Sequence, residues 1–296
     1  MENFPSKNFE GIGIKEKLKS VLKYIHIKLV NEGIGVTDDC RIDMDAYAHF
    51  YPKPGKDDNE KVENRYKRYM SDYQEVDFDN KKNHPNKTAE QIKGEQFEKE
   101  NSQLEIFTLA IFNKFLGDDF IAVRASEYDD FRNSADIVIL KKSTNELVCA
   151  LDDVRGADYK VSNKKVKMEK KYKNSEGGQL QYALEAIKEN GRIRVAHCKP
   201  RRNLPIFYLP LDDKDLKDKG NPCLKNGLRI LNPNLAERSS EEKKYFDKFI
   251  RAIYEQIQFY GPKVKGDLKT NMDNFSKSLD EIIKKHDISF VEPKEE

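Results

Sequence analysis

The chain has 296 residues, enough for one large domain with additions or for two smaller domains. Charged residues make up 36% of the chain, yet the formal net charge is only +2, so any attraction to nucleic acid must be local. The four cysteines form no CxxC pair, which argues against a zinc ribbon and against a disulfide framework. No apolar stretch reaches the roughly 18 residues of a membrane span and the N-terminus lacks a signal-peptide core, so we expect a cytoplasmic protein without membrane contacts.

The N-terminal part, residues 1–87, is expected to combine helical and irregular structure. Apolar side chains at helical spacing predict a helix over residues 14–30, namely Leu18, Val21, Leu22, Ile25 and Leu29. Residues 53–87 are very polar and contain few aliphatic side chains, which is typical of a segment that is partly ordered at best. We therefore expect a polar linker before the next region.

A long helix over residues 88–116 opens the central region. Thr88 is followed three residues later by Gln91, the spacing of a capping box, in which side chains satisfy the free backbone donors of the first turn. Gly117 suits the left-handed position after the last turn. One apolar stripe with a period of about 3.6 residues runs along the helix and comprises Phe97, Leu104, Phe107, Ile111 and Phe115.

Short strands and further helices follow. Runs rich in branched residues predict strands over residues 120–125, 135–140 and 147–154. After a lysine-rich segment, residues 160–173, we expect a helix over residues 177–191, then strands over residues 192–197 and 204–211, and amphipathic helices over residues 241–260 and 275–285.

The predicted fold class is therefore α/β, with a central mixed β-sheet flanked by helices and with helical additions at both ends. The order helix, three strands, helix and strand defines a core over residues 88–211. Residues 212–296 form the C-terminal helical extension.

Two acids on neighbouring strands are the first candidates for chemistry. Asp136 opens the second strand, and Asp153 lies near the end of the third. With an even turn, either residues 144–145 or residues 143–146, the two residues lie opposite each other on one face, about 5 Å apart at Cβ. A five-residue turn would pair Asp136 with Asp152 instead. We favour Asp153 and keep Asp152 as the alternative.

Two ionised carboxylates at this separation repel each other strongly in a partly dry site unless a cation lies between them. A site that offers only oxygen ligands selects a hard ion such as Mg²⁺ or Mn²⁺ over zinc. The pair Asp136 and Asp153 therefore predicts a divalent metal site. Taken singly, each acid is better explained as capping or ending a strand at the surface, and only their combination favours a metal site.

Four motifs in this order resemble the PD-(D/E)XK nuclease superfamily. They are GxxFE at residues 94–98, ADIVI at residues 135–139, ALDDVR at residues 150–155 and QLQY at residues 179–182. The resemblance covers residues 88–211 and implies a restriction-endonuclease-like core. It also implies that Glu98, Asp136 and Asp153 bind one or two divalent ions and that the activity is phosphodiester hydrolysis.

The chain departs from the superfamily two residues after the second acid, where a lysine usually helps to activate water and Arg155 stands here. An arginine does not lose its proton in a protein, so it cannot act as a base, but it can orient a phosphate. A nearby lysine such as Lys160 could reach the same space. Alternatively, the metal alone activates the water.

Gln179 and Tyr182 are three residues apart on a predicted helix and would share a face. In the exonuclease-like branch of the superfamily, a similarly placed glutamine and tyrosine border the metal site or contact DNA, so both are candidate site residues. The alternative is an ordinary helix edge. Glu95 and Glu105, near Glu98 on the first helix, are expected to be solvated rather than to bind metal.

The segment 160–173 contains seven lysines and one glutamate, which supplies a local positive charge. Lysines that neutralise phosphates release counterions, so binding through this segment should weaken with salt. A solvated loop is the alternative. The predicted nucleic-acid contacts are Lys160, Lys164, Lys165, Lys167, Lys170 and Lys171.

The sequence thus predicts a Mg²⁺- or Mn²⁺-dependent nuclease, with DNA favoured over RNA as the substrate. The main alternative is a catalytically inactive module of the same fold that binds nucleic acid or a protein partner. The N- or C-terminal helices could also contact such a partner or a second copy of the chain. A third hypothesis is a structural protein without a nucleic-acid role.

Overall fold

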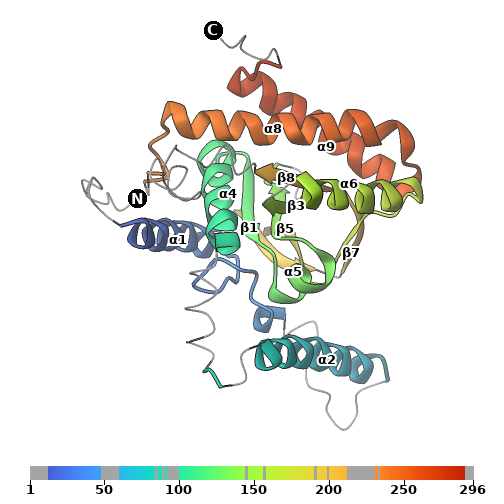
Figure 1. The fold of residues 1–296 in the computed structure, drawn as a ribbon. Helices are drawn as coiled ribbons and strands as arrows, with labels where there is room; N and C mark the ends of the chain where they lie inside the picture. Colours follow the sequence, from blue (N-terminus) through green and yellow to red (C-terminus); the bar gives the residue numbers. More distant parts are fainter. Residues whose placement is uncertain are drawn as a thin grey trace.

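The computed structural model describes residues 13–47, 60–83, 86–88, 91, 100–143, 146–155, 158–189, 192–198, 200–211, 231–232 and 234–290. At its centre lies a four-stranded sheet formed by β1 (Phe120–Arg124), β2 (Ile137–Lys141), β3 (Glu146–Arg155) and β8 (Ile206–Leu211) (Figure 1). The order is β1-β2-β3-β8, with antiparallel β1–β2 and β2–β3 pairs and a parallel β3–β8 pair. The predicted α/β class with a mixed sheet flanked by helices is therefore confirmed.

Helix α4 (Glu100–Leu116) is packed on all sides. Every residue from Leu104 to Leu116 is buried, because the helix lies between α1 (Ile14–Asn31), the sheet and α8 (Ser240–Tyr260). Aromatic side chains stack between α4 and α8, at ring distances of 5.8 Å for Phe112 with Phe249 and 4.8 Å for Phe115 with Phe246. The helix is therefore a core element, and its polar residues need buried partners.

The capping box predicted at the start of the central region is present. The Thr88 N–H donates to Gln91 Oε1 (2.8 Å), and the Gln91 N–H donates to Thr88 Oγ1 (3.3 Å). Residues 89–90 and 92–99 of the predicted helix lie outside the described residues, whereas α4 ends at Leu116, where the sequence placed the helix end.

The predicted helix over residues 177–191 is wrong. These residues contain β4 (Gly178–Leu180) and β5 (Ala183–Glu189), and the helix lies earlier, in the lysine-rich segment, as α6 (Asp158–Lys173). Buried Met168 and Tyr172, four residues apart, give α6 its packing face. The spacing of the apolar residues between 180 and 187 fits a strand as well as a helix. Strand β5 forms because it pairs with β6 (Arg192–Cys198) in an antiparallel arrangement.

A close approach of two chain segments favours glycine at residue 178. Strand β4 pairs with β7 (Arg201–Leu204), and a Cβ added to Gly178 would lie only 2.2 Å from Ile206 Cδ1. A larger residue at this position would require the end of the Ile206 side chain to move.

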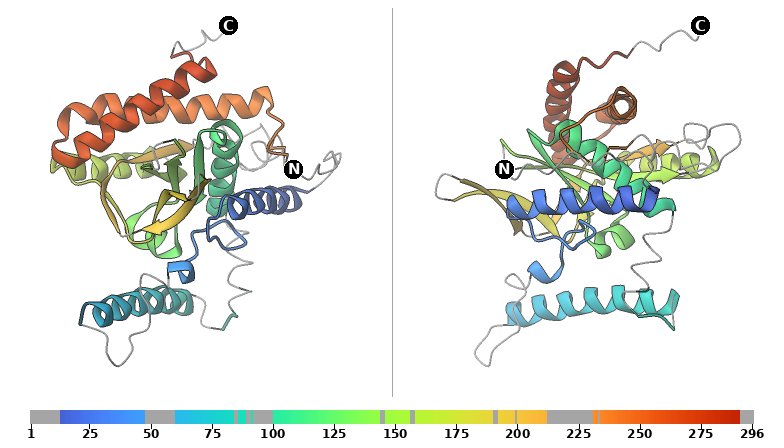
Figure 2. Two further views of the ribbon diagram at one scale, coloured as in Figure 1. Left: turned by 180° about the vertical axis from the view of Figure 1, so that it is seen from behind. Right: turned by 90° about the vertical axis from the view of Figure 1, so that its left-hand side faces the viewer.

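The terminal regions are more helical than the sequence indicated. Helix α1 matches the first predicted helix, but the polar stretch after residue 53 contains α2 (Glu60–Asn83), a helix of 24 residues. Ion pairs at four-residue spacing, Glu63 with Lys67 and Asp77 with Lys81, stabilise this highly charged helix. At the C-terminus, α8 and α9 (Gly266–His286) confirm the two predicted amphipathic helices and lie across one side of the sheet (Figure 2).

Both edges of the sheet are covered. On the β1 side, the segment after α1 pairs with the strand through Ile42 N–H to Arg124 O (3.0 Å) and Arg124 N–H to Cys40 O (3.1 Å). On the β8 side, the amide of Gln256 replaces a neighbouring strand: it accepts from Tyr208 N–H (3.1 Å) and donates to Tyr208 O (2.8 Å). These contacts satisfy backbone groups that an exposed edge would leave open.

Of the helices that the structure describes, none is long and apolar enough to cross a membrane.

A buried ion pair generates the first prediction. Lys114 of α4 and Glu242 of α8 are fully buried and 2.5 Å apart, and the amine also donates to Glu237 O (2.9 Å). Replacing Lys114 by Met should lower the free energy of unfolding by about 3–5 kcal/mol, because it leaves the Glu242 charge buried without its partner. Urea unfolding measures this difference.

The matched control is Lys243→Met, whose half-exposed pair with Asp247 should contribute less than about 1 kcal/mol. The double variant Lys114→Met, Glu242→Gln should recover part of the loss, because no buried charge remains. Equal losses in Lys114→Met and Lys243→Met would show that the buried pair has no special role.

Candidate active site

Acidic side chains from three elements and from the segment before β2 line one cavity of about 250 Å³ at the end of the central sheet. Its walls also include Leu104 and Ser134. The charged residues around it are Glu105 from α4, Asp130 from α5 (Glu127–Asn133), Asp136 just before β2, Asp152 and Asp153 from β3, and Lys164 from α6. Five carboxylates and one amine therefore face a single small space.

The expected pairing of Asp136 with Asp153 is wrong, because the strand register differs by one residue. Ile137 lies opposite Leu151 and the Asp136 N–H donates to Leu151 O (2.9 Å), which places Asp136 beside Asp152. The connection is even, since Lys141 pairs with Glu146. A bulge then shifts the register between Ile139 and Leu140.

Asp153 nevertheless stays in the site. Its backbone N–H donates to Asp136 Oδ2 (2.6 Å), and its own Oδ1 accepts from Thr108 Oγ1 of α4 (3.3 Å). Asp152 is bound instead by the Lys164 amine of α6. The alternation of side chains along β3 thus directs Asp153 toward α4 and Asp152 toward α6.

Three of the acids are close enough to share one ion. Glu105, Asp130 and Asp136 each offer a carboxylate oxygen, and these oxygens lie within 4.8 Å of one another. Glu105 is buried, and the other two are partly buried. Such a set of oxygens at this spacing suits a hard divalent cation.

A neighbouring buried acid holds α5, and with it Asp130, in place. Asp129 accepts hydrogen bonds from the backbone N–H groups of Gln181 (2.7 Å) and Tyr182 (3.0 Å). It also accepts from the side chain of Asn133 (2.7 Å), while its own N–H donates to the cap residue Ser126 (3.0 Å). Asp129 is therefore a structural acid, since its oxygens are used inside the fold.

Burial makes the ionised form of the cavity acids unfavourable. It raises the pKa of Asp136 well above its ordinary value, and the charges of Glu105 and Asp130 raise it further. Burial also raises the pKa of Asp153, with Glu105 adding to the effect and the Thr108 hydrogen bond opposing it. The pKa of Asp152 is raised by burial as well, but Lys164 opposes that shift.

One carboxylate oxygen of the cavity acids lacks a hydrogen-bond donor. Asp153 Oδ2 is buried and has no hydrogen-bond partner in the part of the chain that the structure describes. A buried oxygen without a donor is costly unless a cation approaches it. This oxygen and the raised pKa values of its neighbours both fit a site that takes up a cation.

Two arginines outside the cavity bind its acids from behind. Arg124 of β1 contacts Glu105 and also reaches Asp39 (2.8 Å). Arg41, from the segment after α1, contacts Asp130 (2.8 Å) and Glu105 (3.3 Å). Sequence reasoning missed both arginines, because the contacts join residues that are far apart in the chain.

Of the predicted site residues, Asp136, Asp152 and Asp153 come together, as does Lys164, which was predicted to contact nucleic acid. Glu98 and the side chains of Arg155 and Lys160 lie outside the described residues. Glu105 was expected to be solvated, but it is buried in the cavity wall, so that expectation is wrong. Its position two helical turns after Glu98, on the same face, is the signal that could have identified it.

Gln179 and Tyr182 are not on a helix, and neither lines the acidic cavity. Tyr182 is fully buried, donates to Asp72 of α2 (3.3 Å) and packs edge-on against Tyr128. It therefore connects α2 to the core. Nothing in the structure gives Gln179 a role in the site.

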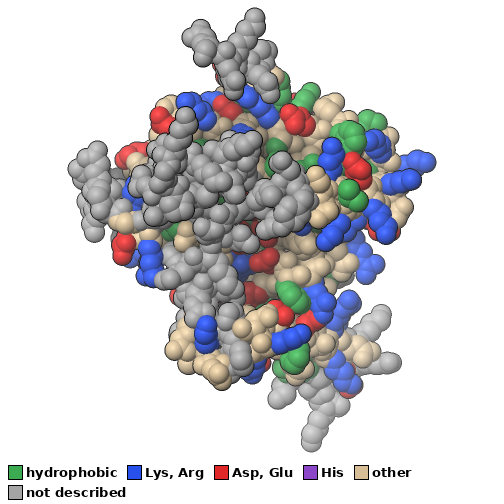
Figure 3. All heavy atoms as spheres, in the orientation of Figure 1, with side chains coloured by type: hydrophobic (Ala, Val, Ile, Leu, Met, Phe, Trp, Pro, Cys, Tyr) green, Lys and Arg blue, Asp and Glu red, His purple; other side chains and the backbone are tan. Residues whose placement is uncertain are grey.

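The remaining predicted nucleic-acid contacts are exposed on α6: Lys165, Lys167, Lys170 and Lys171. Figure 3 shows Lys and Arg side chains gathered at the end of the molecule where Figure 1 places this helix. Lys164 of the same helix reaches the acidic cavity, so the helix that carries these four exposed lysines borders the candidate site.

No protein-family model, curated protein or solved structure was found to match the chain. The likeness to the PD-(D/E)XK superfamily thus remains a resemblance carried by the motifs.

The raised pKa values generate a prediction about stability and pH. Because the folded pKa of Asp136 and Asp153 is above the unfolded value, the folded state keeps protons that the unfolded state loses above about pH 4. With a chelator present, the contribution of these two groups to the free energy of unfolding should therefore fall as the pH rises toward neutral. Asp136→Asn should reduce that fall and melt at a higher temperature than the wild type at pH 7.

Thermal melts in EDTA across this pH range measure the effect, and Asp273→Asn, at an exposed ion pair on α9, is the control. A lower melting temperature for Asp136→Asn than for the wild type at neutral pH would contradict the prediction.

Proposed function

We propose that this chain is a divalent-metal-dependent nuclease that hydrolyses phosphodiester bonds, in DNA more readily than in RNA. The observation that carries the proposal is the cluster of Glu105, Asp130 and Asp136, with carboxylate oxygens within 4.8 Å of one another. The unpartnered oxygen of Asp153 in the same cavity supports it.

The residues fit Mg²⁺ or Mn²⁺. Every candidate ligand is a carboxylate, and no histidine or cysteine lines the described part of the cavity, which disfavours zinc. Glu105, Asp130, Asp136 and Asp153 would hold the ion. When bound, the ion supplies Lewis-acid assistance and lowers the pKa of a water molecule that attacks phosphorus.

Lys164 supplies the positive charge that the superfamily pattern places on β3. Its amine is bound to Asp152 at the cavity wall, and the side chain is 23% exposed, so a phosphate entering the cavity would meet it. It can orient a phosphate oxygen and stabilise the negative charge that develops as the bond breaks. Helix α6 thus brings a lysine to the place where sequence reasoning expected Arg155 or Lys160 to act.

The exposed lysines of α6 would hold the substrate backbone. Lys165, Lys167, Lys170 and Lys171 project from the same helix as Lys164. Phosphates bound along this helix would lead into the cavity. Contacts of this kind position a nucleic acid without reading its sequence.

A second candidate function is an inactive module of the same fold that binds nucleic acid or a protein partner. One observation favours it: Glu105 and Asp130 are already bound by Arg41 and Arg124, which compete with a metal for the same charges. A direct measurement of metal binding and cleavage separates the two functions.

The decisive variant is Asp136→Ala, tested for Mn²⁺ binding by calorimetry and for plasmid nicking with Mg²⁺ or Mn²⁺. Because Asp136 belongs to the acid cluster, both affinity and nicking rate should fall by more than about 100-fold. The exposed Asp273→Ala should retain both. A wild-type protein that retains DNA without binding Mn²⁺ or nicking it would favour the inactive module.

The role of α6 is tested by salt dependence. Each phosphate contact contributes about 0.9 to the slope of log K against log salt, so replacing Lys165, Lys167, Lys170 and Lys171 by Gln should reduce the slope by up to about 3.6. Fluorescence anisotropy on a DNA duplex in Ca²⁺ measures binding at several salt concentrations.

The control carries the same change in charge at four exposed lysines of α8 and α9, namely Lys244, Lys277, Lys284 and Lys285. If both quadruple variants lower the slope equally, the effect is one of net charge, and α6 is not the binding surface.

A further inference from the structure

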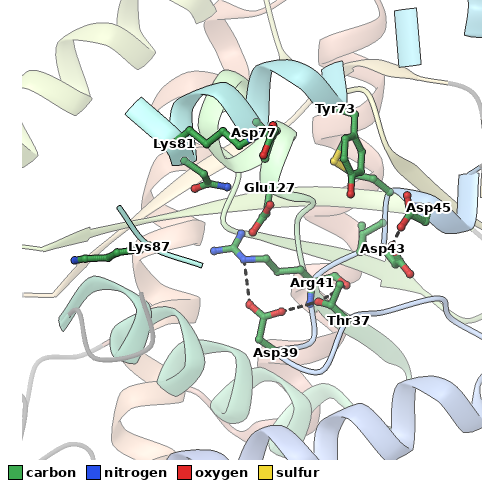
Figure 4. A pocket seen from close by; sticks show the side chains of 14 residues that line it. Thr37, Asp39, Arg41, Asp43, Asp45, Tyr73, Asp77, Lys81, Lys87 and Glu127 are labelled. Carbon is green, nitrogen blue, oxygen red and sulfur yellow. Dashed lines mark hydrogen bonds and ion pairs between the residues drawn. The ribbon is translucent and has the colours of Figure 1, made fainter. Parts of the chain in front are cut away.

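Arg41 reaches the acidic centre from a segment that is fixed by its own backbone. Thr37 N–H donates to Arg41 O (2.9 Å), Arg41 N–H donates to Thr37 Oγ1 (3.2 Å), and the next residue pairs with β1. Figure 4 shows the Arg41 side chain extending past Asp39 along the wall of a second cavity, of about 380 Å³. The guanidinium group therefore stands between that cavity and the acidic centre.

The contacts of this guanidinium involve acids that would otherwise carry free charge. Nη1 lies 2.8 Å from Asp130 Oδ2, Nη2 lies 3.3 Å from Glu105 Oε2 and Nε lies 3.3 Å from Asp39 Oδ2. Water screens the contact with Glu105 least, because the Arg41 and Glu105 side chains are 11% and 10% exposed, whereas Asp130 and Asp39 are 31% and 42% exposed. Asp130 has no other cation within ion-pair distance among the described residues.

The acids of the centre outnumber the cations that contact them. Three cations, Arg41, Arg124 and Lys164, face the five cavity acids, and the two arginines also contact Asp39 outside the cavity. The two acids that no described cation contacts within ion-pair distance are Asp136 and Asp153, which accept hydrogen bonds from Asp153 N–H and Thr108. A divalent ion beside these two acids would favour their ionised forms and supply the positive charge that the described side chains do not give them.

We propose that Arg41 is a resident cation that occupies the place of a second metal and so limits the acidic centre to one divalent ion. This inference rests on the proposed function, because it requires that the centre binds metal at all. Arg41 is thus a positioning residue. It contacts the Glu105 and Asp130 carboxylates from one side, while these two acids, with Asp136 and Asp153, hold a single ion from the other.

A simpler role for Arg41 is to tie the N-terminal segment to the core. That role predicts a loss of stability on substitution but no change in the number of ions bound. Counting bound ions therefore separates the two roles without relying on activity.

The experiment titrates the full chain with Mn²⁺, counting bound ions by calorimetry and by the loss of the free-ion paramagnetic resonance signal. The wild type should bind one ion. Arg41→Met should bind two, because Glu105 and Asp130 then lack one positive charge. Arg41→Lys retains the charge and should bind one. The matched control Arg238→Met removes an arginine whose ion pair, with Asp118, lies away from the cavity, and should also bind one.

Two ions bound to the wild type, or one bound to Arg41→Met, would overturn the inference and leave the nuclease proposal standing. No Mn²⁺ bound to the wild type would instead remove the proposed function itself. If Arg41→Met does not fold, Arg41→Gln, which keeps hydrogen-bond donors without the charge, gives the same count.

Discussion

Mutual repulsion among five carboxylates is the constraint on which the acidic centre depends. Glu105, Asp130, Asp136, Asp152 and Asp153 face one cavity of about 250 Å³, where burial weakens the screening that water would give. A fold can hold such a cluster only by adding cations and donors around it. In this protein Arg41 and Arg124 contact Glu105, and Lys164 contacts Asp152. Thr108 donates a hydrogen bond to Asp153, and the Asp153 backbone N–H donates one to Asp136.

These compensating groups also explain why the helices lie where they do. Helix α4 brings both Glu105 and Thr108 to the cavity and is itself buried along its length, which requires the aromatic packing of α8 on its outer side. Helix α6 covers β3 from the other side and supplies Lys164. The site is thus built from helices that also form the core, so a change in their packing alters the distances among the acids.

The sequence predicted the layout better than the details of the site. Strands and the helix ending at Leu116 were predictable because their apolar patterns were long and bounded by turn residues. The register of Asp136 was not predictable. The connection spans residues 142–145, one residue earlier than the four-residue turn considered from the sequence, and the bulge between Ile139 and Leu140, which has no sequence signal, adds one residue, so Asp152 lies opposite Asp136. The prediction of a helix over residues 177–191 was wrong because the apolar spacing in this segment also fits a strand. Pairing with β6, which the sequence of the segment does not show, selects the strand. Glu105 was misjudged because burial depends on contacts distant in sequence.

The N-terminal segment illustrates the same dependence on distant contacts and shows why it matters for the site. Its backbone extends the sheet at β1, and that pairing fixes Arg41 next to Glu105 and Asp130. Helix α2 is attached separately, through the hydrogen bond from Tyr182 to Asp72 and through that from Tyr69 to Asp45. The carboxylates come from residues 105 to 153, but part of their neutralising charge comes from before residue 48. The charge of the centre is therefore set jointly by the core and by the segment that precedes it, and neither part defines the site alone.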